Sequence, residues 1–152
     1  MELLENGTEY LKDFVQLNEE WISRYFELES SDLAFRENPF IIVEEGGYIF
    51  TLVDAGEVLG VCSLLNKGED SYELAKMAVA PKHQGKKYGH LLMQGVMDKL
   101  QDIGAKSVYL YSNTMLDPAI SLYRKYGFET LSTGQHANYK RANIKMGIQL
   151  VP

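Results

Sequence analysis

The sequence predicts a single α/β domain with a mixed, mostly antiparallel sheet, one parallel βαβ crossover and helices on both faces of the sheet. Three observations support this fold class. Strand-like segments in residues 48–80 are joined by short turns, which favours an antiparallel meander. A strand, a helix and a second strand follow one another in residues 72–112, the order of a right-handed parallel crossover. The chain of 152 residues has the length of one domain, 1–152.

The first third of the chain is predicted to be mainly helical. Met1 to Asn6 could form a short strand before the turn signal Asn6-Gly7. From Thr8 to Glu29, apolar residues recur at intervals of three and four, as on one face of a helix, and Thr8 is a plausible N-cap. A second helix, Ser31 to Glu37, should end before Asn38-Pro39, because the residue before proline avoids the helical region.

The middle of the chain is predicted to form three antiparallel strands. Phe40 to Val43 is too short to assign. Tyr48 to Val53 and Val58 to Leu65 are typical of a hairpin closed around Asp54-Ala55-Gly56. The third strand, Tyr72 to Ala80, is apolar enough to be buried, and Pro81 ends it.

The last third is predicted to hold two helices and two strands. An apolar stripe from Tyr88 to Ile103 indicates a helix that Gly104 ends. Ser107 to Ser112 should then lie parallel to the preceding strand. A helix over 119–126 begins after Asp117 and Pro118, and strict alternation over 144–150 predicts a strand with one buried face.

Composition narrows the possible functions. A net charge of -6 argues against a general nucleic-acid-binding protein, which needs a basic face. No apolar stretch approaches the ~20 residues that cross a membrane, so we expect no membrane partner. The single cysteine, Cys62, lies in an apolar run and fits a cytoplasmic location. The histidines His83, His90 and His136 show no metal-ligand spacing, so we expect no metal.

The loop from Lys82 to His90 is the strongest functional signal. In this acidic chain it contains five lysines and histidines interleaved with Gln84, Gly85 and Gly89, and it lies between a predicted strand and a helix. A helix N-terminus has unpaired N–H groups and a partial positive charge, which favours an anion such as a pyrophosphate. The ligand could be a mononucleotide, a dinucleotide or coenzyme A. The patterns GxxxxGK[ST] and GxGxxG are absent, which leaves coenzyme A favoured, although spacing alone does not select it. A solvated basic loop is the alternative.

Two runs of sequence resemble one family. AVAPKHQGKKYGHLLM resembles the acyl-CoA-binding motif of the GCN5-related N-acetyltransferase (GNAT) superfamily, with Gln84 in its first position and Gly89 in its last. SNTMLDPAISLYRKYGF resembles the second hallmark of the superfamily, an Asn followed by a helix that ends in Tyr-x-x-x-Gly-Phe. ELAKMAV and YKRANIKM are similar to bacterial members also found fused to MarR-type regulators. The resemblance covers about Tyr48 to Phe128.

The resemblance implies transfer of an acetyl group from acetyl-CoA directly to a primary amine of a small molecule or peptide. It gives Tyr123 the role of general acid and Glu73 that of the base that accepts the amine proton; the alternatives are a packed aromatic ring and an exposed strand-end carboxylate. Asn113 would bind the coenzyme or, alternatively, cap a loop. The implied cofactor-binding residues are Met77, Ala78, Val79, Gln84, Gly85, Lys86, Lys87, Tyr88, Gly89 and Asn113.

Lys87 departs from the family pattern, because it replaces the inner glycine of the motif. A lysine there should require an ordinary negative φ, and its side chain either reaches a phosphate or faces solvent. Lys76 follows Glu73 by three residues and is expected on the opposite pleat. A non-catalytic acyl-CoA-binding regulatory module is the alternative function, and a homodimer is a possible assembly. Candidates for the acceptor site are Trp21, Arg24, Tyr25, Glu27, Glu29, Tyr139 and Arg141.

Overall fold

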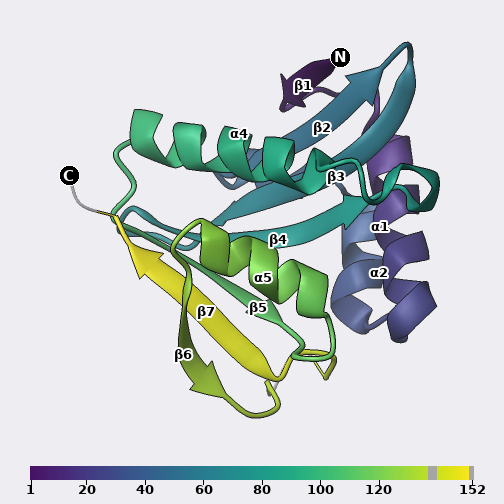
Figure 1. Ribbon diagram of the computed structural model, residues 1–152. Coiled ribbons are helices and arrows are strands. Elements are labelled where there is room, and N and C mark those ends of the chain that lie inside the picture. Colours follow the sequence, from purple (N-terminus) through teal and green to yellow (C-terminus); the bar gives the residue numbers. More distant parts are fainter. Residues whose placement is uncertain (137–139, 151–152) are drawn as a thin grey trace.

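The computed structural model describes residues 1–136 and 140–150, which form one seven-stranded sheet with helices on both faces (Figure 1). The strand order is β1-β2-β3-β4-β5-β7-β6, and β4 with β5 is the parallel pair. The predicted fold class is therefore confirmed. The elements are β1 (Glu2–Glu5), α1 (Leu11–Tyr25), α2 (Ser30–Glu37), α3 (Ile41–Glu44), β2 (Tyr48–Asp54), β3 (Glu57–Asn66), β4 (Ser71–Val79), the 3-10 turn η1 (Pro81–His83), α4 (Tyr88–Asp102), β5 (Ser107–Ser112), α5 (Asp117–Lys125), β6 (Glu129–Thr133) and β7 (Ile144–Gln149).

Two apolar clusters hold the layers together. The stripe of α4 that includes Leu92 and Val96 packs with Tyr123 of α5 against one face of the sheet. Phe14 of α1 and Phe35 of α2 pack against the other face, with their rings in edge contact at 5.7 Å. The sheet is therefore buried on both sides where β3 and β4 run through its centre, which explains why these strands are almost continuously apolar.

The parallel pair is short. β4 and β5 are in register for three residue pairs, the last of which is Glu73 with Tyr109. Beyond that point neither strand has the other as a partner, so the second half of β4 and the end of β5 diverge (Figure 1). On the far side of β5, β7 pairs antiparallel along its whole length. The sheet is thus split between β4 and β5 on one half only.

β4 carries a bulge within the part that diverges from β5. Ser63 pairs with Ala75 and Val61 with Ala78, so Lys76 and Met77 together face a single residue of β3. Lys76 adopts a left-handed φ of 59°, and its Nζ lies 4.3 Å from the centre of the Phe35 ring. The expected opposite pleat for Lys76 was therefore wrong, because the extra residue returns its side chain to the α1 and α2 face.

Other differences from the predictions are local. Tyr10, not Thr8, is the N-cap of α1, and it makes no side-chain capping bond. The unassigned segment 40–43 lies largely in the single-turn helix α3. The edge strand β6 was missed because all five of its residues are exposed and show no apolar alternation. Within residues 1–136 and 140–150, no helix combines the length and apolar character that a bilayer span requires.

Candidate active site

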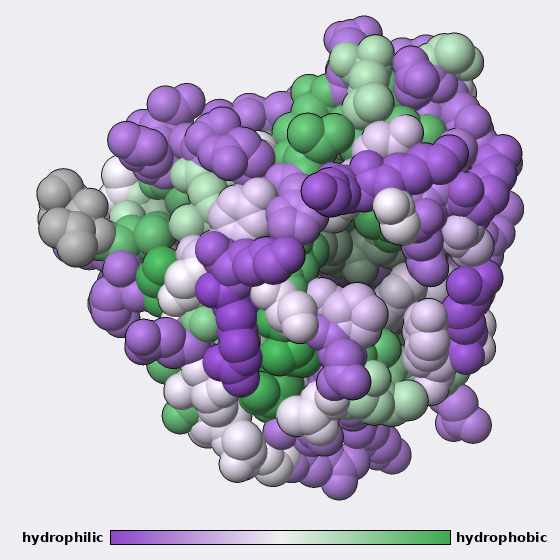
Figure 2. Space-filling view, in the orientation of Figure 1, coloured by the Kyte–Doolittle hydropathy of each residue, from purple (hydrophilic) through white to green (hydrophobic). Residues whose placement is uncertain are grey.

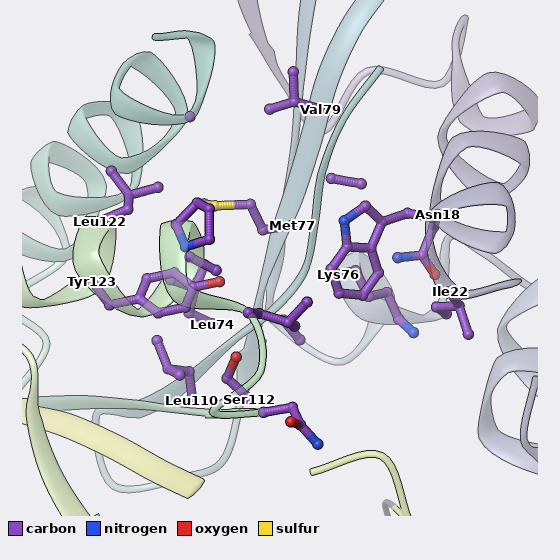
Figure 3. A pocket seen from close by; sticks show the side chains of 18 of the residues that line it. Asn18, Ile22, Leu74, Lys76, Met77, Val79, Leu110, Ser112, Leu122 and Tyr123 are labelled. Atoms are coloured by element: carbon purple, nitrogen blue, oxygen red, sulfur yellow. The ribbon is translucent and has the colours of Figure 1, made fainter. Parts of the chain in front are cut away.

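A cavity of about 650 Å³ occupies the split between β4 and β5. Its lining comes from both faces of the sheet: Leu122 and Tyr123 of α5 lie on one side, and Asn18 and Ile22 of α1 on the other (Figure 3). Met77 of β4 lies between them. The space-filling view shows the molecule hollowed at this position, with apolar surface inside (Figure 2). The cavity therefore connects the two faces, so that two ligands can approach each other from opposite sides.

The basic loop forms one end of the cavity. Gly85 has a φ of 82°, and no heavy atom lies within 4 Å of where its Cβ would be, so its backbone is open to a ligand. Gln84 Nε2 donates to the Val79 carbonyl at 3.3 Å and ties the loop to the end of β4. Tyr88 begins α4, and the exposed Lys86 precedes it by two residues.

Lys87 is the N-cap of α4 and has φ 66° and ψ 23°, in the left-handed region. The expected negative φ was wrong. The chain keeps at this position the backbone conformation that glycine adopts without strain, although it carries a lysine. Two residues later, a Cβ on Gly89 would approach Leu122 Cδ2 to 3.1 Å, so glycine permits the close contact of α4 with α5.

His83 lines the same end of the cavity and was not among the predicted site residues. Both of its ring nitrogens are buried and make no hydrogen bond to a described residue. Glu57 Oε2 lies 3.3 Å from Nε2, close enough for an ion pair when the ring is protonated but poorly directed for a hydrogen bond. Sequence spacing gave no signal for this arrangement, because Glu57 belongs to β3.

Tyr123 extends from α5 into the cavity toward Met77 (Figure 3). It is 9% exposed, and burial raises the pKa of its phenol above the ordinary value. The group is therefore neutral at physiological pH and is a proton donor. Asn113 also lines the cavity, but both ends of its amide are engaged: Nδ2 donates to the Arg141 carbonyl at 2.9 Å, and Oδ1 accepts from the Met115 N–H at 3.0 Å.

Glu73 lies where β4 and β5 begin to separate. It is 4% exposed, so the alternative of an exposed strand-end carboxylate was wrong. Burial raises the pKa of Glu73, whereas the positive charges of three lysines oppose that rise. The nearest of them, Lys67, has its Nζ 3.9 Å from Oε1. A buried carboxylate with a raised pKa is a stronger base than an exposed one.

A partly buried ion cluster lies behind the cavity wall at Arg141. Arg141 binds Asp32 through two hydrogen bonds of 2.8 and 3.0 Å and Glu29 through one of 2.9 Å. Burial alone would raise the pKa of Asp32, but the hydrogen bonds from Arg141 and from the Glu29 N–H lower it below its usual value. This cluster joins the start of α2 to the segment before β7.

The acceptor candidates separate into three groups. Trp21, Tyr25 and Arg141 line the cavity, whereas Arg24, Glu27 and Glu29 do not. Tyr139 lies outside the described residues. Asn18 and Lys76 line the cavity and were missed: Asn18 looked like one more polar residue of an amphipathic helix, and Lys76 reaches the site only through the bulge.

This fold is the fold of acetyltransferases with known structures. An acetyltransferase of the GNAT family from Staphylococcus aureus matches with a TM-score of 0.86 at 16% identity, covering 99% of both chains. An aminoglycoside 6'-N-acetyltransferase complexed with coenzyme A matches with a TM-score of 0.76 at 15% identity, covering 100% of this chain and 98% of that one. At such identities the likeness concerns the fold alone.

The sequence model of the acetyltransferase (GNAT) family matches residues 14–128, and the chain belongs to this family. A mycothiol acetyltransferase from Pseudarthrobacter chlorophenolicus is 33% identical over 108 residues, which are 66% of this chain and 32% of that protein. The chain thus spans about a third of the length of the mycothiol acetyltransferases it matches.

Proposed function

We propose that this protein transfers an acetyl group from acetyl-CoA directly to a primary amine of a small molecule or peptide. One observation carries the proposal: a single cavity runs through the split sheet, with the basic loop 82–90 at one end, Tyr123 in the middle and Glu73 beyond it. Family membership and a structural relative complexed with coenzyme A support it. The buried single cysteine, Cys62, fits a cytoplasmic location.

The loop and β4 suit the parts of the co-substrate. Residues 85–89 offer backbone N–H groups at the N-terminus of α4 and include Lys86 and Lys87, and this combination suits phosphate oxygens. Pairing of β4 with β5 ends at Glu73, so an extended amide chain such as pantetheine can pair with the edge of β4 beyond that residue. The predicted cofactor residues Met77, Ala78 and Val79 lie on this stretch and line the cavity.

The chemistry needs a base, an oxyanion donor and an acid. Glu73 accepts the proton that the amine loses as its nitrogen bonds to the thioester carbonyl carbon, directly or through water. A backbone N–H of the segment Met77–Val79 stabilises the charge that develops on the carbonyl oxygen. Tyr123 donates its proton to the sulfur as the C–S bond breaks, and solvent returns a proton to the phenol while Glu73 releases one.

Release of coenzyme A thiol, measured against a panel of polyamines, amino acids, aminoglycosides and peptides, tests the proposal. We expect amine-dependent thiol release, and we expect Tyr123→Phe to lower kcat by about 10²-fold or more. Tyr126→Phe is the matched control, because Tyr126 follows α5 directly and does not line the cavity, and the substitution removes a hydroxyl that donates to the His90 carbonyl. Unchanged turnover in Tyr123→Phe would remove the acid role.

A non-catalytic acyl-CoA-binding module is the second candidate, and the left-handed lysine in the cofactor loop is the observation that favours it. Thermal stabilisation by coenzyme A without turnover of any amine would support this candidate. Absence of both stabilisation and turnover would remove both functions.

A further inference from the structure

Lys76 occupies an unusual position in the cavity. A left-handed φ costs a residue with a Cβ about 1–2 kcal/mol, and such strain persists only where the surrounding structure imposes it. Here the bulge imposes it, and the result is a lysine on the same side of the cavity as Asn18 and Ile22 (Figure 3). The strained position therefore delivers a positive charge to the wall opposite Tyr123.

The ammonium of Lys76 has no carboxylate partner among residues 1–136 and 140–150, since none lies within 4.0 Å of it. The ammonium lies over the face of the Phe35 ring. Burial lowers the pKa of the Lys76 ammonium. The negative charges of Asp32 and Glu73 oppose this decrease, whereas the positive charge of Arg141 adds to it. An aromatic face attracts a cation but adds no formal negative charge, so the lysine is open to an anion.

The carboxylates near Lys76 are already engaged. Both oxygens of Asp32 accept hydrogen bonds from Arg141, and Glu29 binds the same guanidinium and the backbone N–H of Lys140. Glu73 has Lys67 as its close partner. Of the charged residues that line this end of the cavity, Lys76 and Arg141 are positive and Glu73 is negative. This end of the cavity therefore carries an excess of positive charge, although the chain as a whole has a net charge of -6.

We propose that the acceptor is a free amino acid, whose carboxylate pairs with Lys76 while its amine lies beside Glu73; this inference rests on the proposed acetyl transfer. The bulge places the two side chains on one face of β4, so adjacent groups of opposite charge can be bound together. Asn18 is 3% exposed and lines the cavity. Its side-chain amide makes no hydrogen bond to a described residue and can bind the same carboxylate. Trp21, Ile22 and Phe26 line the cavity and favour an apolar or aromatic side chain.

This assignment distinguishes amino acids from polyamines and from peptide N-termini. A polyamine has only positive charge to offer Lys76, and a peptide has an amide where a free amino acid has its carboxylate. The negative net charge of the whole chain would favour polyamines, but the positive charge inside the cavity favours a ligand with a carboxylate. Charges inside the cavity act at short range, whereas salt screens the surface charges, so the cavity should decide the preference.

Matched acceptor pairs test the inference. L-phenylalanine and L-leucine are compared with L-phenylalaninamide and L-leucinamide, and with spermidine, at equal concentrations of unprotonated amine. We expect each acid to exceed its amide by about tenfold or more in kcat/KM, equivalent to about 1.4 kcal/mol. Lys76→Met should reduce this ratio to about one, and Lys76→Arg should retain part of it.

Lys145→Met is the matched control. Lys145 also lies in the field of Glu73, but it stacks on Tyr109 and Tyr111 and does not line the cavity, so its loss should leave the acid-to-amide ratio unchanged. If amides or spermidine react as well as the acids in the wild-type protein, acetyl transfer stands and the carboxylate site is refuted. The same holds if Lys76→Met keeps the full ratio.

A binding measurement gives an answer that does not depend on turnover. The side-chain resonances of Lys76 are followed by NMR while N-acetyl-L-phenylalanine or its carboxamide is added, with and without coenzyme A. A shift caused by the acid alone supports the inference even if no amine of the panel is acetylated. No shift with either compound overturns it, whereas failure of coenzyme A to bind would overturn the proposed function instead.

Discussion

Replacement of Lys87 by glycine should stabilise the protein. The residue has φ 66°, a conformation that costs a side chain with a Cβ about 1–2 kcal/mol and glycine almost nothing. Glycine also gains freedom in the unfolded chain, which opposes the effect by roughly 0.5–1 kcal/mol. The expected net gain for Lys87→Gly is about 0.5–1 kcal/mol, measured as a higher midpoint of urea unfolding at an unchanged slope.

Two further variants distinguish relief of backbone strain at position 87 from loss of the lysine charge. Lys87→Ala removes the ammonium but keeps the Cβ, so its stability should remain near that of the wild-type protein. Lys86→Gly changes a neighbouring exposed lysine that is not left-handed, and it should lose stability, because glycine there only adds freedom to the unfolded chain. If Lys87→Gly is no more stable than Lys87→Ala, the argument from backbone strain is refuted.

Three further variants test other features of the structure. Asp32→Ala leaves Arg141 with Glu29 alone and should lower the free energy of unfolding by about 3 kcal/mol at neutral pH. Because folding lowers the pKa of Asp32, urea titrations should show this difference shrinking as pH falls below about 4. Because folding raises the pKa of Glu73, the wild-type protein should lose stability relative to Glu73→Gln as pH rises above about 4.5. If the stability difference between the two proteins were constant across pH, burial would not raise the pKa of Glu73. In Gly47→Ala the new Cβ would lie 2.3 Å from the Leu64 carbonyl oxygen, so thermal melts should show a loss of about 3 kcal/mol or more, whereas Gly7→Ala, where the nearest atom is 3.7 Å away, should be tolerated.

The fold class could be predicted from the sequence because local patterns and global topology agree. The alternation in 144–150, the glycine stop after α4 and the proline at the start of α5 each correspond to the observed element. The edge strand β6 has no buried face, so its residues carry no periodic signal. Its place in the sheet depends on pairing with β7, the next strand along the chain.

The motif residues of the candidate site could be predicted from the sequence, but the positions of its charged side chains could not. The loop at 84–89 and Tyr123 were predicted through their resemblance to the family motifs. Tyr123 and all of the loop residues except Lys86 line the cavity. Lys76 could not be placed, because a one-residue bulge reverses the side to which every following side chain points. Arg141, Asp32 and Glu29 meet only through tertiary structure, over separations of more than 100 residues.

The position of β7 has a consequence for how the chain is made. Strand β7 inserts between β5 and β6, which precede it in the sequence. Until the ribosome has released residues 144–149, β5 has an open edge and β6 has no strand to pair with, so the half of the molecule that includes β5 cannot be completed. Open edges of this kind invite aggregation during synthesis. Substitutions in β7 should therefore reduce the yield of folded protein more than their effect on equilibrium stability would suggest.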